Sequence, residues 1–296
     1  MTSFSKTLAG GLGAVALVAV TVSFAFRLEA DETLAVAELP AHTHIHGLAV
    51  DRHDPSKLLI ATHHGLFVAG PGGKAERVSV IQDFMGFNPH PSNPNTLYAS
   101  GHPAEGGNLG FIASTDQGKT WTKVSPGVNG PVDFHQMSVS PADPNTIYGS
   151  YKGLQITRDA GQTWTLVGPT PDGLISLAAS AKGANTLYAA TESGLLISKD
   201  TGKTWTSVLN GAPVSLVHVT PGGTLYAYIV GRGLVRSSED AMKLTEVGND
   251  LGGDVLLHLA SDPTNPNRLF AATGKSRVLT STDQGRTWKA FGSSTS

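Results

Sequence analysis

The chain has 296 residues, of which 40% are hydrophobic and 15% charged, and this composition supports a sizeable core rather than a disordered chain. The formal net charge is -2 and no run of Lys or Arg is longer than a pair, which excludes the basic surface of a nucleic-acid-binding protein. The absence of cysteine excludes disulfides, thiolate metal ligands, a cysteine nucleophile and lipid attachment to Cys.

The N-terminus contains an uncharged stretch, Thr7 to Phe26, which is about 20 residues long and would cross a bilayer as a helix. Ser23 and Ala25 also form a weak signal-peptide cleavage site. We therefore expect residues 1–31 to be a hydrophobic helix and a linker, either retained as a signal anchor or removed as a signal peptide. Contact with the membrane would be made by this segment, and the body, residues 32–296, would be exported to the periplasm or the cell surface.

All four tryptophans end the same local pattern, in which Ser or Thr, Asp, Gly and Thr recur at fixed positions. The copies occupy residues 114–121, 157–164, 198–205 and 281–288. Successive tryptophans are 43, 41 and 83 residues apart, and the doubled last interval predicts a decayed copy, with residues 237–240 as its remnant. In the first repeat, residues 70–74 stand where the motif is expected.

A second element recurs with the same period, a short run of apolar residues that ends in Ala or Gly. Its six copies are residues 58–61, 96–99, 146–149, 186–189, 224–227 and 268–271. Each unit reads as four short strands, A to D in chain order, in about 42 residues, the size of a propeller blade. We therefore predict an all-β, six-bladed β-propeller of four-stranded blades. Residues 33–39 are mostly apolar and would pair with the last blade to close the ring.

The four motifs resemble Asp boxes, also called bacterial neuraminidase repeats, which occur in sialidases, in sortilin-type receptors and in the photosystem II assembly factor family. The whole chain, including residues 44–51, most resembles small exported bacterial proteins labelled glycosylhydrolase by similarity. In the families that the motif resembles, the box lies on the propeller face opposite the binding site. Hydroxyl and carboxylate groups of such a motif also bond turn amides, which indicates a structural role. The box carboxylates are Asp116, Asp159, Asp200 and Asp283.

Histidines gather at the other end of the predicted channel. Aligning the six A strands on the turns that follow them places polar residues of blades 1 to 3 at two levels of the channel, and strand alternation aims them at one face. These residues are His44, His46, Asp83, Met85, Asp133 and His135. Blades 4 to 6 present apolar residues or glycine at these levels, with Val214 expected at the same level as His46.

We interpret this group as a site for a divalent metal or copper ion, because neutral imidazoles are common ligands and carboxylates complete or orient them. Met85 would favour copper if its thioether coordinates. The alternative is a hydrated channel mouth, in which the histidines bond to water and to neighbouring acids. His63 and His64 are interpreted as solvated loop residues.

Glycoside hydrolysis is the alternative function, because it typically uses two carboxyl groups that flank the scissile bond. Asp83 and Asp133 are the catalytic candidates for it. A sialidase would also need an arginine cluster and a tyrosine activated by an acid, which this face offers only in scattered form. The residues expected to contact a ligand are His102, Glu105, Tyr151, Glu192 and Arg232.

A third class of function is an interaction scaffold, because propellers bind partners through their loops, of which residues 101–108 form a long one. The prediction is therefore an extracytoplasmic binding propeller, expected to be a monomer, with a metal-binding channel mouth. Its partner would be an exported protein, a peptide or a glycan, and no nucleic acid.

Overall fold

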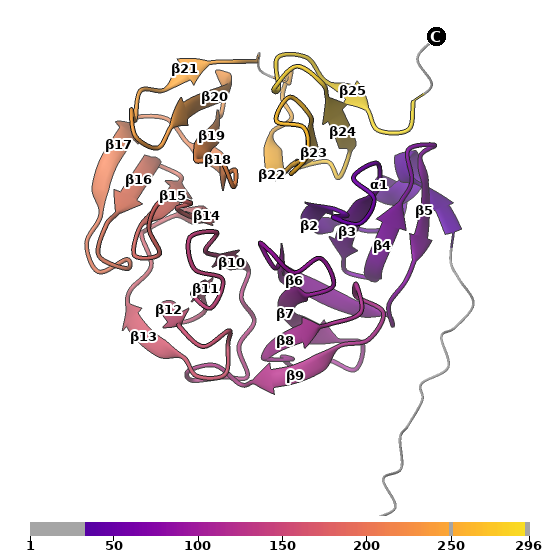
Figure 1. Ribbon diagram of the computed structural model, residues 1–296, viewed down its shortest axis with the longest axis horizontal. Coiled ribbons are helices and arrows are strands. Elements are labelled where there is room, and N and C mark those ends of the chain that lie inside the picture. The colour runs from indigo at the N-terminus through magenta and orange to yellow at the C-terminus, as the bar shows by residue number, and fades with distance from the viewer. Residues whose placement is uncertain (1–32, 249–250, 294–296) are drawn as a thin grey trace, which may run out of the picture.

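The computed structural model describes residues 33–248 and 251–293. Over these residues the chain forms a ring of six antiparallel sheets around a central channel (Figure 1), which confirms the predicted six-bladed all-β propeller. The predicted N-terminal helix, and its role as anchor or signal peptide, lie outside the described residues. In the two described ranges, no helix has the length and apolar character needed to cross a membrane.

Each blade places its four strands in chain order from the channel outward (Figure 1). The A strands are β2 (Ile45–Val50), β6 (Gln82–Pro89), β10 (Gln136–Val139), β14 (Leu174–Ala179), β18 (Val214–Val219) and β22 (Leu256–Ser261). The B strands are β3 (Leu58–Thr62), β7 (Leu97–Pro103), β11 (Ile147–Ser150), β15 (Leu187–Thr191), β19 (Thr224–Ile229) and β23 (Leu269–Thr273). The C strands are β4 (Gly65–Ala69), β8 (Phe111–Ser114), β12 (Leu154–Thr157), β16 (Gly194–Ser198), β20 (Gly233–Ser238) and β24 (Val278–Ser281). The D strands are β5 (Lys74–Arg77), β9 (Thr122–Ser125), β13 (Thr165–Gly168), β17 (Thr206–Asn210), β21 (Thr245–Glu246) and β25 (Lys289–Ala290).

The N-terminal strand differs from the expectation that it closes the ring by pairing with the last blade. β1 (Thr33–Ala35) instead pairs antiparallel with β5 and becomes a fifth strand of blade 1. The outer strand of the last blade, β25, is only 2 residues long and offers a short edge for pairing. β1 thus covers the longer free edge of β5, which would otherwise expose unpaired backbone groups.

The first and last blades are joined by apolar packing. After β1 the chain turns through the 3-10 helix η1 (Val36–Glu38) and the helix α1 (Leu39–His42). Leu39 is fully buried and belongs to the same hydrophobic cluster as Phe270 and Phe291 of blade 6. The segment that was expected to pair with blade 6 therefore contacts it through side chains.

The Asp boxes form the tight hairpins between strands C and D, as the box of blade 3 illustrates. Thr157 and Thr163 donate their hydroxyl groups to the two carboxylate oxygens of Asp159, each at 2.6 Å. Gly161 has a φ of 90°, and a β-carbon here would lie 2.0 Å from a ring atom of Phe111 in the neighbouring blade. The box thus fixes a turn and packs it against the next sheet, which agrees with a structural role.

The inner strands carry a β-bulge that aims one side chain into the channel. In four blades, one residue of strand A is skipped by the pairing with strand B, because a bulge inserts an extra residue. These residues are His46, Ile175, Ser215 and Leu257, and all of them line the central cavity. In blade 5 the expected residue was Val214, but Val214 pairs with Ile229 and is fully buried, so Ser215 faces the channel instead.

Candidate functional site

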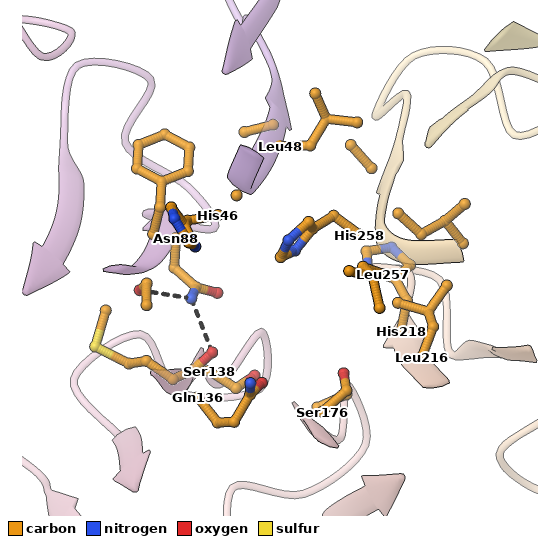
Figure 2. Close-up of a pocket in the computed structure, with 18 of the residues that line it drawn as sticks. His46, Leu48, Asn88, Gln136, Ser138, Ser176, Leu216, His218, Leu257 and His258 are labelled. Atoms are coloured by element: carbon orange, nitrogen blue, oxygen red, sulfur yellow. Dashed lines mark hydrogen bonds between the residues drawn. The ribbon is translucent and has the colours of Figure 1, made fainter. Parts of the chain in front are cut away.

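The six inner strands enclose a cavity of about 870 Å³ (Figure 2). In this view His46 and Asn88 stand on one wall, while His218 and His258 stand on the opposite wall. Apolar side chains such as Leu48 separate these polar groups. The channel is therefore a mixed surface, and its histidines and acids are concentrated at the end opposite the Asp boxes.

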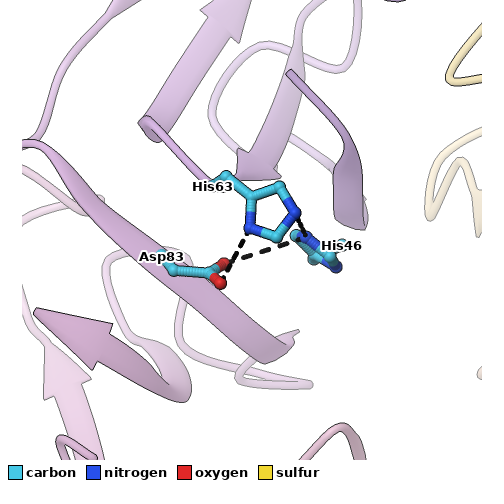
Figure 3. A group of neighbouring side chains, drawn as sticks. All are labelled: His46, His63 and Asp83. Carbon is cyan, nitrogen blue, oxygen red and sulfur yellow. Dashed lines mark hydrogen bonds and ion pairs between the residues drawn. The ribbon is translucent and has the colours of Figure 1, made fainter. Parts of the chain in front are cut away.

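Three side chains from blades 1 and 2 meet at this end, and we call them the first triad (Figure 3). They are His46, the bulge residue of β2, His63, the first residue after β3, and Asp83, the second residue of β6. The Nδ1 atom of His63 lies 2.8 Å from Oδ2 of Asp83, and its Nε2 atom lies 3.0 Å from Nε2 of His46. The Nε2 atom of His46 lies 3.8 Å from Oδ1 of Asp83. Two imidazoles and one carboxylate thus surround one small volume.

Burial is the largest of the effects that lower the pKa of the His46 imidazole from 6.5 to about 4. The carboxylate of Asp83 opposes this shift, and the neighbouring rings of His63 and His135 add to it. The ring is therefore neutral at pH 7, which is the form that binds metal ions. The Oδ1 atom of Asp83 is buried and has no hydrogen-bond partner among the described residues. Such an oxygen is unfavourable in a protein interior, and a bound cation would satisfy it.

A second triad joins blades 2 and 3. It consists of His102, near the end of β7, and of Asp133 and His135, which lie directly before β10. The Nε2 atoms of His102 and His135 approach the same oxygen, Oδ2 of Asp133, at 3.0 and 2.8 Å. Asp133 is only 5% exposed, and its Oδ1 atom is buried without a hydrogen-bond partner in the described part of the chain. This carboxylate therefore also has an oxygen left for a cation.

Both ring nitrogens of His102 face acceptors. Its Nδ1 atom lies 2.8 Å from the backbone oxygen of Gly107, and its Nε2 atom faces Asp133. Burial alone would raise the pKa of Asp133, but hydrogen bonds and charge from His135 and His102 outweigh it and lower that pKa, so the carboxylate is ionised. A neutral imidazole has one N–H, and an ionised carboxylate only accepts. A neutral His102 can donate to only one of these two acceptors, and a metal cation at Nε2 would satisfy the contact with Asp133.

The two triads meet in one pair of strands. Asp83 of β6 and His102 of β7 lie directly opposite each other in the antiparallel ladder. Such partners have β-carbons about 4.5–5.5 Å apart on one face of the sheet. The hydrogen bond to Asp133 is the main cause of the raised pKa of His135, and the charge of Asp83 adds to it. The two triads are therefore neighbours at the junctions of blades 1 to 3.

The structure divides the predicted metal-binding group between these triads, because four of its six residues belong to one or the other. His44 is exposed beside the first triad, with its ring centre 5.5 Å from that of His63. Met85 is buried and lines the cavity. The predicted single cluster is therefore two clusters with Met85 nearby on the same strand as Asp83.

The residues predicted to contact a ligand are less closely grouped. His102 belongs to the second triad, and Tyr151 accepts a hydrogen bond from Nδ2 of Asn108 at 3.2 Å. Glu105 and Glu192 are exposed at the ends of their B strands. Glu105 and Glu192 are thus accessible to a partner, and His102 is the member of this set that belongs to a triad.

Two arginines of this face are paired with acids. Arg232 forms an exposed ion pair with Glu246 at 2.9 Å. Arg277 donates from Nε and Nη2 to Oδ2 of the buried Asp254, at 3.1 and 2.8 Å. Each of these two guanidinium groups is committed to its own acid, in place of the arginine cluster that a sialidase uses to bind a substrate carboxylate.

The prediction that His63 is a solvated loop residue is incomplete, because the spacing of the repeat already places His63 at the channel mouth. His63 and His102 stand five residues after Leu58 and Leu97, respectively. These leucines occupy equivalent positions, because each pairs with the last residue of its A strand. Aligning the B strands as well as the A strands therefore brings both histidines to the channel mouth.

The family described as BNR/Asp-box repeat matches residues 112–123, which contain the whole of the first box. The protein is therefore a six-bladed propeller that contains an Asp-box repeat. No curated protein sequence matches the chain significantly.

Solved structures resemble this propeller at low sequence identity. The GH74 xyloglucanase from Xanthomonas campestris is 16% identical with a TM-score of 0.58, and the match covers 88% of this chain and 46% of that one. A gluconolactonase from the same organism is 14% identical with a TM-score of 0.63, covering 85% and 89%. YCF48 bound to a D1 peptide is 18% identical with a TM-score of 0.53, covering 90% and 85%. The chain spans less than half the length of the xyloglucanase, and identities this low show the fold alone.

Proposed function

We propose that this Asp-box propeller is an extracytoplasmic binding protein whose channel mouth holds a divalent metal or copper ion. The observation that carries the proposal is the convergence of two imidazoles and one carboxylate in each triad. In each triad one buried carboxylate oxygen has no hydrogen-bond partner within residues 33–248 and 251–293. Histidine nitrogen and carboxylate oxygen are the donors of many zinc, copper and iron sites. The uncharged stretch at residues 7–26 supports export.

The first triad has the spacing that such an ion requires. Metal–nitrogen bonds of about 2.0–2.1 Å place two ligand nitrogens of a tetrahedral site roughly 3.3 Å apart, and the Nε2 atoms of His46 and His63 are 3.0 Å apart. Oδ2 of Asp83 holds the Nδ1–H group of His63, as carboxylates commonly orient ligating histidines. Oδ1 of Asp83 would complete the donor set. A coordination position then stays open for a ligand from the channel.

The identity of the metal depends on Met85. Met85 stands two residues after Asp83 on β6, and its buried side chain lines the same cavity as His46. A thioether ligand selects Cu(I), whereas imidazole and carboxylate alone suit Zn²⁺ or Cu²⁺. Substitution of Met85 should therefore weaken Cu(I) binding selectively if the sulfur coordinates.

We propose that an exported protein, peptide or glycan reaches the open coordination position from the face that carries the triads. Loops on a rigid propeller suit this task because they combine a fixed scaffold with variable side chains. The loop that follows β7 begins close to His102 and contains the exposed Glu105. A protein of similar fold, YCF48, has been solved with a D1 peptide bound, which supports a peptide as one class of partner.

Glycoside hydrolysis is the second candidate, favoured by the likeness to GH74 enzymes and by the carboxylates Asp83 and Asp133. A glycosidase keeps one carboxylic acid protonated at its working pH, which requires a raised pKa. Asp133 has a lowered pKa because two histidines donate to it. Its chemistry therefore suits a metal ligand better than a general acid.

Metal binding is tested on the purified full-length protein after chelation. Elemental analysis and calorimetry with Zn²⁺ and Cu²⁺, together with competition for Cu(I) by a chromophoric chelator, should show tight binding by the wild type. The double variant His46→Ala/His135→Ala removes one ligand from each triad and should bind none of the three ions tightly. Tight binding that survives in this variant, or no binding by the wild type, would contradict the proposal.

The hydrolase alternative has its own test. Aryl glycosides, including sialosides, are incubated with the wild type and with Asp83→Asn and Asp133→Asn. We expect no turnover above background by any of the three proteins. Turnover that the wild type shows and either substitution abolishes would place hydrolysis ahead of binding.

A further inference from the structure

We infer that the two triads form one dinuclear metal centre, which binds a dianionic oxyanion between its two ions: the phosphate group of inorganic phosphate or of a phosphate monoester. This inference rests on the proposed metal binding and gives the ligand class for the same site.

The repeat itself places two sites side by side. His63 and His102 occupy equivalent positions at the ends of the B strands of blades 1 and 2. Asp83 and Asp133 occupy equivalent positions before the inward-facing residues of blades 2 and 3, as the sequence alignment of the A strands indicates. Each triad therefore lies at the boundary between two neighbouring blades. Equivalent positions of the repeat form a triad at two successive boundaries.

The separation of the two sites suits a shared ligand. Asp83 of the first triad and His102 of the second are direct partners across β6 and β7, so their β-carbons are about 4.5–5.5 Å apart. Two-metal sites that bind one substrate keep their ions about 3.5–4 Å apart. The two triads thus begin from one strand pair, and the inference requires their ions to lie at that order of separation.

The charge balance of the loaded site calls for an anion. Two divalent ions bring four positive charges, while Asp83 and Asp133 together bring two negative charges, and the histidine ligands bind as neutral rings. Among the described residues that line the central cavity, Asp83 is the one carboxylate. The excess of two positive charges matches a dianionic phosphate group, whose oxygens are ligands for both ions.

The space beside the triads also fits such a ligand. The central cavity extends from the first triad, and a second cavity of about 630 Å³ borders His135. Thr170 and Ser150 line this second cavity and offer hydroxyl groups, while the exposed Asp172 lies on the same lining. A phosphate group at the ions could therefore carry an organic substituent outward between blades 3 and 4.

The test uses the full-length protein, stripped of metal and then titrated with Zn²⁺. Elemental analysis should find two ions per chain in the wild type and one in each of the variants His63→Ala and His102→Ala. Calorimetry with inorganic phosphate and with glycerol phosphate follows, on metal-free and metal-loaded protein. Phosphate should bind only to the loaded wild type, and its affinity should fall at least about tenfold in either single variant, since a tenfold loss needs only about 1.4 kcal/mol.

The outcomes separate this inference from the proposed function. Binding of both probes with similar affinity assigns the site to phosphate monoesters, and binding of inorganic phosphate alone assigns it to the free anion; both support the oxyanion site. One ion per wild-type chain, or two ions without phosphate binding, would overturn the inference and leave metal binding intact. No ion at all would reject both. The matched control is His64→Ala, a substitution in the same turn as His63, and it should behave as the wild type. Circular dichroism verifies that each variant is folded.

Discussion

His63 and His64 are consecutive residues of one exposed turn, yet their rings have different partners: Nδ1 of His63 lies 2.8 Å from Asp83, whereas the ring centre of His64 is 6.4 Å from that of His63. His63→Ala should therefore weaken Zn²⁺ binding at the first triad by at least about 100-fold, because even orienting groups contribute 10–100-fold to metal affinity. His64→Ala should leave it unchanged. Calorimetry on the two variants decides the matter, and equal losses would mean that the turn as a whole, rather than the triad, binds the ion.

Removal of the metal should destabilise the propeller. An ion that binds only the folded chain at 100 times its Kd adds about 2.7 kcal/mol to the free energy of unfolding, which corresponds to a rise in Tm of roughly 5 °C or more for a chain of this size. Differential scanning calorimetry with Zn²⁺ and with a chelator should show this rise in the wild type. The variant Asp83→Asn/Asp133→Asn should show the same Tm in both conditions, and an equal rise there would place the ion elsewhere.

Trp164 of the blade 3 box should contribute strongly to stability. Its ring centre lies 4.8 Å from that of Phe134 and 5.3 Å from that of Phe111, so it bridges two blades. Trp164→Ala should cost about 3 kcal/mol of unfolding free energy, at the low end for a Trp because the side chain is only partly buried. Leu166→Ala, nearby on an exposed position, should cost under about 0.5 kcal/mol. Denaturant unfolding measures both, and similar losses would contradict the packing role.

The fold was predictable because its signal is repeated. Four intact boxes and six apolar runs fix the blade length, so the loss of a box in blades 1 and 5 does not hide the period. The partner of β1 was not predictable in this way, because residues 33–35 occur once and both β5 and β25 were open edges. Only the lengths of those edges, which are tertiary information, favour β5.

The site was predictable where the strand register held. Alignment of the A strands predicts that His46 and His135 point into the channel, as the structure shows. The same alignment contains no information about side chains from the B strands. His63 therefore escaped it. In blade 5 the bulge moved the inward position from Val214 to Ser215, because one inserted residue reverses the facing of a strand. Both differences arise from backbone features that a single sequence does not reveal.

The Asp boxes should make the propeller sensitive to acid. Hydrogen bonds, above all from box threonines, lower the pKa of Asp159, Asp200 and Asp283 from 3.8 to about 2. A pKa that is lower in the folded chain than in the unfolded chain adds stability above pH 3.8, and this stability is lost as the pH falls toward 2. Asp159→Asn should therefore have a lower Tm than the wild type at pH 4 and a smaller drop in Tm between pH 4 and pH 2. Asp240→Asn, in the decayed box of blade 5, is the matched control and should drop as the wild type does; if Asp159→Asn dropped equally, the box carboxylate would not be the acid-sensitive group.

A second pH dependence should come from His218, inside the channel. Burial lowers the pKa of its imidazole from 6.5 to about 4, and its Nε2 atom lies 3.2 Å from Oγ of Ser261. Because the folded chain holds this ring neutral while the unfolded chain protonates it below pH 6.5, the stability it contributes is complete above pH 6.5 and is lost as the pH falls toward 4. His258 and His46 titrate in the same window, so the wild type should lose stability there through several groups.

The contribution of His218 is isolated by the variant His218→Gln, which keeps a polar side chain and cannot gain the proton. Denaturant unfolding at pH 7, 6 and 5 measures how the free energy of unfolding changes with pH. This free energy should fall less steeply with decreasing pH in the variant than in the wild type. The difference between the two slopes should be less than about 1.4 kcal/mol per pH unit, the value for one proton. The reduction should stay below that limit because the ring also borders the channel space. His42→Gln, at an exposed position outside the channel lining, should retain the wild-type slope. If the slopes of His218→Gln and the wild type were the same, His218 would already be free to take up a proton in the folded chain, and the channel would be open to water at that level.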